Sequence, residues 1–174
     1  MMTQQTQKFD KNSFISVSDT DEERMYKLKV AQIALYLKES GIFETFTVDE
    51  IMKLAGACSL DTYLSNDAVV SEKSKVSELY IFGDGQIEES MTAIDGIVKT
   101  LRIIKKGSVF GVESIISDSE AKTTYEVVSK QAKVVRIDKE IIEEVFKRKP
   151  DGLKRLLENE MNQKAKLQRL WTME

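Results

Sequence analysis

The stretch LYIFGDGQI, at residues 79–87, decides the fold. Its first four side chains are apolar or aromatic and are typical of a strand. Gly83, Asp84 and Gly85 then supply residues that tolerate positive φ, so the chain can reverse before Ile87 resumes the apolar pattern. The stretch therefore predicts two short strands joined by a tight turn.

Further short runs show the same preference for β-forming side chains, and polar or glycine-containing breaks separate them. Asp95 and Gly96 form the strongest of these breaks, because this dipeptide favours the tip of a β-hairpin. The further runs lie at residues 62–64, 68–70, 97–104, 125–128 and 132–137. Together the segments predict an antiparallel β-roll, similar to a jelly roll, of about eight short strands.

Helical periodicity precedes the predicted roll. Asp19 or Thr20 is expected to cap a first helix, which should end at Gly41. Thr47 followed by Glu50 resembles a capping box, and it predicts a second helix that runs to about residue 57. The chain is therefore expected to begin as two helices joined by a tight link.

The helical period returns after the last predicted strand. Asp138 is expected to cap one helix, and Pro150 to end that helix and open another. The predicted fold class is therefore α+β, with a β-roll between two pairs of helices. The expected organisation is a flexible or partner-ordered tail at residues 1–20 and one domain at 21–174, with helices at 21–58, the roll at 59–138 and C-terminal helices at 139–174.

Composition excludes several classes of function. The chain has 174 residues and a formal charge of -3, which argues against a direct nucleic-acid partner. It contains no histidine, so Ser-His-Asp catalysis and histidine-based metal sites are excluded, and neither catalytic nor metal-binding residues are expected. The lone Cys58 lies in an apolar stretch and is interpreted as a small buried thiol. Carboxylate or lysine chemistry stays open, but no convergent carboxylate pair is visible in the predicted strands, so we do not expect an enzyme.

The sequence also indicates a location. No apolar run approaches the ~20 residues that span a bilayer, and residues 1–11 lack the apolar core of a secretory signal. We expect an intracellular, cytoplasmic protein without membrane contact, and a ciliary assembly is one natural setting.

Four segments, at 31–58, 71–82, 83–87 and, as GSVFG, at 107–111, follow one another in a specific order. In that order they resemble the cyclic-nucleotide-binding domain family, which includes the regulatory subunit of cyclic-AMP-dependent protein kinase, gated ion channels and the catabolite activator protein. The last of the four segments matches the family's glycine, two spacers, Phe-Gly. The resemblance covers about Met25 to Met161 and implies the same β-roll.

In relatives that bind ligand, Phe-Gly leads into a short helix that holds the cyclic phosphate, while a glutamate binds the ribose and an arginine pairs with the phosphate. Val112 stands where the family has its glutamate. A shift of one residue would make Glu113 the ribose partner and put Lys122 at the arginine position. The candidate ligand-binding residues implied by this resemblance are Gly111, Val112, Glu113, Ser114, Lys122 and Thr123.

The substitution of lysine for arginine weakens the expected site. A lysine offers one point charge in place of a planar two-point clasp, and the acidic residues Glu113, Asp118 and Glu120 disfavour capture of an anion. Losing one charged hydrogen bond costs ~1.5–3 kcal/mol, or roughly ten- to a hundredfold in affinity. The alternative interpretation is that Val112 and Ile115 pack the roll, while the charged residues form a solvated face.

The last helix of the family is a moving lid, and an aromatic residue from it can cover the base. Trp171 is therefore a candidate lid residue, although the alternative that it docks on the domain or on a partner is favoured. We expect a non-catalytic domain with weak or lost nucleotide binding that acts as a regulatory or structural subunit of a larger protein assembly. The alternative is a genuine cAMP or cGMP sensor whose C-terminal helix relays binding to a partner. No cofactor is expected other than such a nucleotide.

Overall fold

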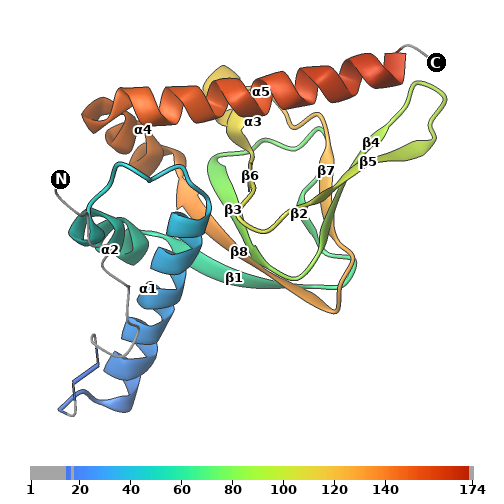
Figure 1. Cartoon of the computed structure of the whole chain (residues 1–174). Coiled ribbons are helices and arrows are strands. Elements are labelled where there is room, and N and C mark those ends of the chain that lie inside the picture. The colour runs from blue at the N-terminus through green and yellow to red at the C-terminus, as the bar shows by residue number, and fades with distance from the viewer. Residues whose placement is uncertain (1–14, 17, 173–174) are drawn as a thin grey trace, which may run out of the picture.

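Two antiparallel sheets form a roll, and helices cover one side and one end of it (Figure 1). The computed structural model describes residues 15–16 and 18–172. One four-stranded sheet has the order β1-β8-β3-β6, and the other the order β2-β7-β4-β5. The strands are β1 (Ser59–Leu64), β2 (Ala68–Val70), β3 (Glu78–Asp84), β4 (Ile87–Thr92), β5 (Val98–Ile104), β6 (Val109–Phe110), β7 (Thr124–Val127) and β8 (Gln131–Asp138). The predicted fold class and number of strands are confirmed.

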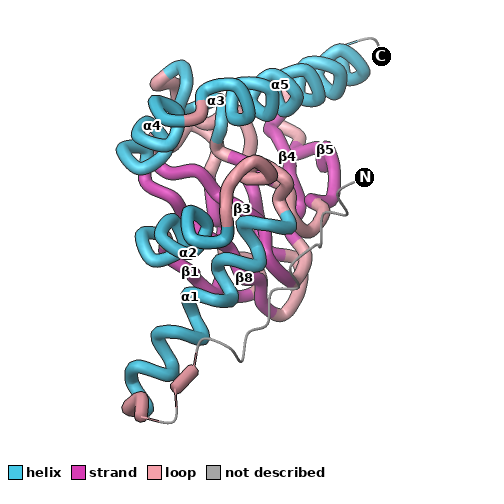
Figure 2. Tube along the Cα trace, turned by 60° about the vertical axis from the view of Figure 1, so that its left-hand side comes forward, coloured by secondary structure: helices cyan, strands magenta, loops and turns pink. Residues whose placement is uncertain are grey.

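The helices lie before, within and after the strands. Figure 2 shows α1 and α2 beside the sheet that contains β1, β8 and β3, with α5 across one end of the roll. The helices are α1 (Asp21–Glu39), α2 (Val48–Ala57), α3 (Val112–Ser117), α4 (Lys139–Arg148) and α5 (Pro150–Thr172). In this described part of the chain, no helix combines the length and the apolar content needed to cross a membrane.

Strand β3 is buried on both of its faces. Leu79 and Ile81 belong to an apolar cluster shared with the helices, while Tyr80 and Phe82 belong to a second cluster inside the roll. Successive side chains of a strand point to opposite faces, so a strand buried on both faces is apolar throughout. This is why the LYIF sequence has no polar alternation and why β3 lies at the centre of the fold.

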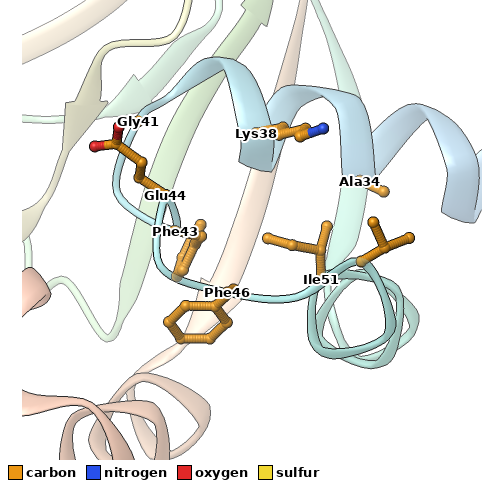
Figure 3. Close-up of a pocket in the computed structure, with 8 residues that line it drawn as sticks. Ala34, Lys38, Gly41, Phe43, Glu44, Phe46 and Ile51 are labelled. Carbon is orange, nitrogen blue, oxygen red and sulfur yellow. The ribbon is translucent and has the colours of Figure 1, made fainter. Parts of the chain in front are cut away.

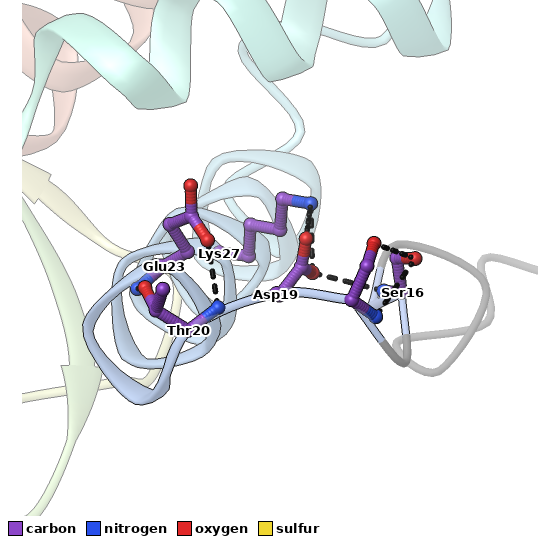
Figure 4. A network of polar contacts seen from close by, with 6 residues as sticks. Ser16, Asp19, Thr20, Glu23 and Lys27 are labelled. Atoms are coloured by element: carbon purple, nitrogen blue, oxygen red, sulfur yellow. Dashed lines mark hydrogen bonds and ion pairs between the residues drawn. The ribbon is translucent and has the colours of Figure 1, made fainter.

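Capping explains where the first two helices begin. Thr20 forms a reciprocal capping box with Glu23 at the start of α1, and Lys27 binds Asp19 beside it at 2.8 Å (Figure 4). Thr47 and Glu50 form the predicted capping box of α2. Each box satisfies backbone donors that the first helical turn leaves free.

Two details of the predicted helices and strands need correction. Asp138 precedes α4 as expected, but within the described residues its side chain makes no capping hydrogen bond, so only its extended backbone starts the helix. Strand β6 was missed, because its two residues pair only with Tyr80 and Ile81 and are too few to show a period. Pro150 opens α5 as predicted.

Candidate functional site

Gly111 sets the geometry of the cassette, which we define as residues 110–124. It precedes α3 with φ +85°, a conformation that side chains disfavour. A Cβ at this position would lie 2.8 Å from the carbonyl oxygen of Glu78 and 3.0 Å from the ring of Tyr80. The close approach of two strands and the left-handed backbone therefore both require glycine here.

Val112 is buried in the apolar core. Its side chain is 4% exposed and belongs, with Ile115, to the apolar cluster between the roll and the helices. A branched apolar side chain in this position cannot hydrogen-bond a ribose hydroxyl. The burial of Val112 and Ile115 supports the alternative interpretation that both residues pack the roll.

Glu113 and Lys122 bind each other. The ammonium Nζ of Lys122 lies 2.5 Å from Oε1 of Glu113, and the Lys122 side chain is 55% exposed. The two candidate ligand residues are thus brought together, but each is the partner of the other. The other candidates lie elsewhere. Thr123 is buried inside the roll, and Ser114 is a residue of α3 whose side chain is outside the described part of the chain.

The unshifted register offers no polar pair either. Glu113 and Lys122 are separated by the same interval as Val112 and Ala121, one position earlier in the sequence. In that register, valine replaces the family's glutamate and alanine replaces its arginine. Ala121 is buried inside the roll and carries only a methyl group. In neither register do the described cassette residues present a carboxylate and a cation that are both free to meet a cyclic nucleotide.

Helix α5 covers the cassette. The cavity that remains between them has a volume of about 10 Å³. A single water needs about 10–15 Å³ and a ligand pocket several hundred, so this cavity does not admit a nucleotide as it stands. Its lining residues are Val109, Phe110, Gly111, Val112 and Glu113 from the roll and cassette, and Glu160, Met161 and Lys164 from α5.

A buried carboxylate beside the cassette was not predicted. Glu89 on β4 is 1% exposed, and its Oε1 accepts hydrogen bonds from the hydroxyls of Thr123 at 2.8 Å and Tyr125 at 2.7 Å. Its Oε2 accepts from Nε of Arg102 at 2.7 Å. The available signal was the period of the strand, because Glu89 shares a face with the buried Ile87.

The pKa of Glu89 reflects these partners. Burial alone would raise the pKa of this carboxyl, but the charge of Lys164, the hydrogen bond from Tyr125 and the contact with Arg102 outweigh it and hold the pKa below its ordinary value. Burial next to Glu89 raises the pKa of the Tyr125 phenol. Glu89 is therefore ionised and Tyr125 is a neutral donor at neutral pH.

Other features of the described residues do not form a reactive centre. Burial raises the pKa of the Cys58 thiol to about 12, which is the expected property of an inert, packed cysteine. No group of three or more carboxylate, thiol or imidazole residues in the described part of the chain is placed to hold a metal ion. Trp171 lies in the last turn of α5, but nothing is described of its side chain, so its role as a lid stays a prediction.

A larger cavity lies outside the roll. It has a volume of about 390 Å³ and opens between the end of α1, the link at residues 42–46 and the start of α2 (Figure 3). Phe43, Phe46 and Ile51 provide its apolar wall, with Lys38 and Glu44 at its edge. It is separate from the cassette, with which it shares no lining residue.

The sequence of the chain is similar to those of known proteins. A family model described as "Cyclic nucleotide-binding domain" matches residues 60–149, more than half of the chain. A cGMP-dependent protein kinase, egl-4 of Caenorhabditis briggsae, is 23% identical over 127 residues, which cover 72% of this chain and 17% of the kinase.

Solved structures share the fold. The regulatory domain of Toxoplasma gondii PKA with cAMP has a TM-score of 0.69 at 15% identity, covering 81% of this chain and 52% of its own. The regulatory subunit of a cAMP-independent protein kinase A from Trypanosoma brucei has a TM-score of 0.65 at 18% identity, covering 75% and 48%. The Thermus thermophilus catabolite activator protein has a TM-score of 0.65 at 16% identity, covering 76% and 61%. The chain thus spans less than two thirds of each of these relatives.

Proposed function

Because this chain belongs to the cyclic nucleotide-binding domain family, we propose that it is a non-catalytic regulatory or structural subunit of a larger protein assembly, in which cyclic nucleotide binding is weak or lost. The observation that carries this proposal is the pairing of Glu113 with Lys122. The two charged groups that a shifted register would offer to ribose and phosphate neutralise each other. A nucleotide must separate them before it gains their contacts.

The energies lower the affinity for a nucleotide. Each charged hydrogen bond to a ligand is worth about 1.5–3 kcal/mol, and separating the exposed pair subtracts up to about 1 kcal/mol from that gain. Lysine also replaces the bidentate arginine contact by a single point charge. Helix α5 adds a further barrier. The cavity between it and the cassette has a volume of only about 10 Å³, so a ligand must move the helix away before it can bind.

The relatives support a role in an assembly. Regulatory subunits and domains of protein kinases are prominent among them, and a subunit is part of an assembly. The Trypanosoma brucei relative is described as the regulatory subunit of a cAMP-independent protein kinase A. A non-catalytic protein with protein partners is therefore the role that we propose here.

Isothermal titration of the full chain with cyclic AMP and cyclic GMP tests the proposal. We expect no saturable heat with either nucleotide up to about 1 mM, since the loss of two charged contacts moves a micromolar site into the millimolar range. Adenosine monophosphate is the control for non-specific binding of a phosphate. A dissociation constant in the low micromolar range for either cyclic nucleotide contradicts the proposal.

The second candidate function is a genuine cyclic nucleotide sensor. The specific observation in its favour is the Gly111 turn, whose left-handed geometry and tight packing keep the frame that leads into α3. In this case Lys122 would leave Glu113 to meet the phosphate, and α5 would relay the change. The variant Lys122→Ala separates the two functions, because it abolishes a micromolar signal of a sensor and leaves the flat titration of our proposal unchanged.

A further inference from the structure

Four alternating charges lie between the roll and α5, and we call them the charge cluster. Glu89 and Arg102 come from the strands, and Glu160 and Lys164 come from α5. Each positive group contacts a negative one: Arg102 contacts Glu89 at 2.7 Å and Glu160 at 3.7 Å, and Lys164 contacts Glu89 at 3.6 Å. The strands supply one charge of each sign and α5 supplies the other two, so the contacts between the two halves form only when α5 lies over the roll.

The ammonium group of Lys164 lies beside a carboxylate and an aromatic ring. Its Nζ lies 3.6 Å from Oε1 of Glu89 and 5.4 Å from the centre of the Tyr125 ring. A carboxylate and an aromatic face together bind alkylammonium groups, by charge and by cation–π attraction. The same Glu89 oxygen is fixed by Thr123 and Tyr125, so the acceptor is oriented before the lysine arrives.

The two α5 residues act from one face of the helix. Glu160 and Lys164 are separated by one helical turn, and neighbours at this interval point in the same direction. Between them lies Met161, which shares the small cavity over Gly111 with both of them. The contacts that hold α5 to the roll are therefore the same contacts that close the cassette.

The N-terminal end of α5 is also fixed by a lysine. Lys149, which directly precedes α5, places its ammonium 2.9 Å from Glu50 and 2.9 Å from the carbonyl oxygen of Thr45. The ammonium lies 4.5 Å from the centre of the Phe46 ring. The junction between α4 and α5 is thus tied to the N-terminal helices, which limits the directions in which α5 can swing.

We propose that the roll interior is a receptor for a primary ammonium group and that Lys164 of the chain's own α5 is its resident ligand. The helix is then held closed over the cassette without any nucleotide. This inference concerns Glu89 and Lys164, whereas the proposed function concerns Glu113 and Lys122. Either can fail while the other stands.

Hydrogen exchange of the full chain, measured without nucleotide, tests whether Lys164 holds α5 on the roll. In Lys164→Met, amide protection along α5 is expected to fall about tenfold, the effect of losing one charged contact. Lys154→Met is the matched control, because Lys154 is an exposed lysine on the same helix, and it should leave protection unchanged. Equal protection in the two variants overturns the proposal.

A double-mutant cycle with Glu89→Gln guards against a general loss of stability. If Lys164 acts through Glu89, the two substitutions are strongly non-additive for α5 protection, and the second adds little to the first. Additive losses overturn the proposal, because they mean that Lys164 and Glu89 act separately.

Chemical rescue identifies the class of ligand. The variant Lys164→Ala leaves the ammonium site without its side chain, so n-butylammonium chloride should raise its melting temperature in a saturable way. The same salt should not raise the melting temperature of Lys154→Ala or of the unaltered chain. A rise of equal size in all three proteins contradicts an ammonium receptor in the roll.

Discussion

Replacement of Glu89 by alanine is expected to lower the free energy of unfolding by about 3–5 kcal/mol, as is usual when one partner of a buried charged network is removed. The substitution leaves the hydroxyls of Thr123 and Tyr125 without their acceptor. It also removes the nearest contact of the Arg102 guanidinium. Small domains are stable by about 5–15 kcal/mol, so a large part of the stability is at stake. Urea denaturation at neutral pH measures the loss.

The neighbour Glu88 provides the matched control. It lies on the same strand with its side chain outside the buried network, and it accepts a hydrogen bond from the exposed Thr100. Glu88→Ala should cost less than about 1 kcal/mol, as exposed polar contacts usually do. Similar losses for both variants would show that the strand, and not the buried carboxylate, sets the stability.

The pH dependence identifies the source of the loss. The pKa of Glu89 is lowered from an ordinary value of 4.5 in the folded chain, so its stabilisation is complete above that pH and is lost as the pH falls through the folded pKa. The free-energy gap between the unaltered chain and Glu89→Gln should therefore be constant near neutral pH and shrink below about 4.5. Burial raises the pKa of Glu160, and the charge of Glu89 raises it further, so both proteins are compared in a Glu160→Gln background. A gap that does not narrow in acid would contradict an ionised Glu89.

Gly85→Ala is the second substitution with a large expected effect, a loss of about 2–4 kcal/mol. The residue has φ +97°, and an added Cβ would lie 2.8 Å from the Cα of Ala132 and closer still to the carbonyl oxygen of Gln131. Both obstacles are backbone atoms of β8, which cannot turn aside as a side chain would. Thermal unfolding followed by circular dichroism measures the effect.

Gly96 separates strain from collision. Its φ is +81°, but an added Cβ meets nothing within 4 Å among the described residues, because the glycine lies at the tip of the β4–β5 hairpin. Gly96→Ala should therefore show only the backbone term, about 1–2 kcal/mol. If Gly85→Ala costs no more than Gly96→Ala, the packing of this turn against β8 is wrong.

The sequence was enough to predict most of the fold, because the deciding signals are local. The apolar run at residues 79–82 and the glycine turn after it mark β3 and β4 without any knowledge of their partners. Thr47 and Glu50 mark the start of α2, since a capping box acts within one turn. Signals of this kind need only a short stretch of chain.

The candidate site was predictable only in part. Gly111 and the pairing positions Glu113 and Lys122 follow from one continuous segment, but the ion pair between them depends on how the segment turns. Glu89 follows the glycine turn by only a few residues and is a charged residue, so the sequence does not mark it as buried. Its partner Lys164 is on a distant helix. Such a contact arises from the packing of distant segments, which the pattern of residues within one segment cannot predict.

The most direct measurement is the two-dimensional NMR spectrum of the labelled chain during titration with cyclic AMP, followed at the amide of Gly111. This amide lies at the start of α3, where any cyclic phosphate held by the cassette must alter its surroundings. We predict that its chemical shift, and those of Glu113 and Lys122, stay unchanged through about 1 mM nucleotide. A saturable shift of Gly111 at low micromolar nucleotide, accompanied by changes along α5, would contradict the account.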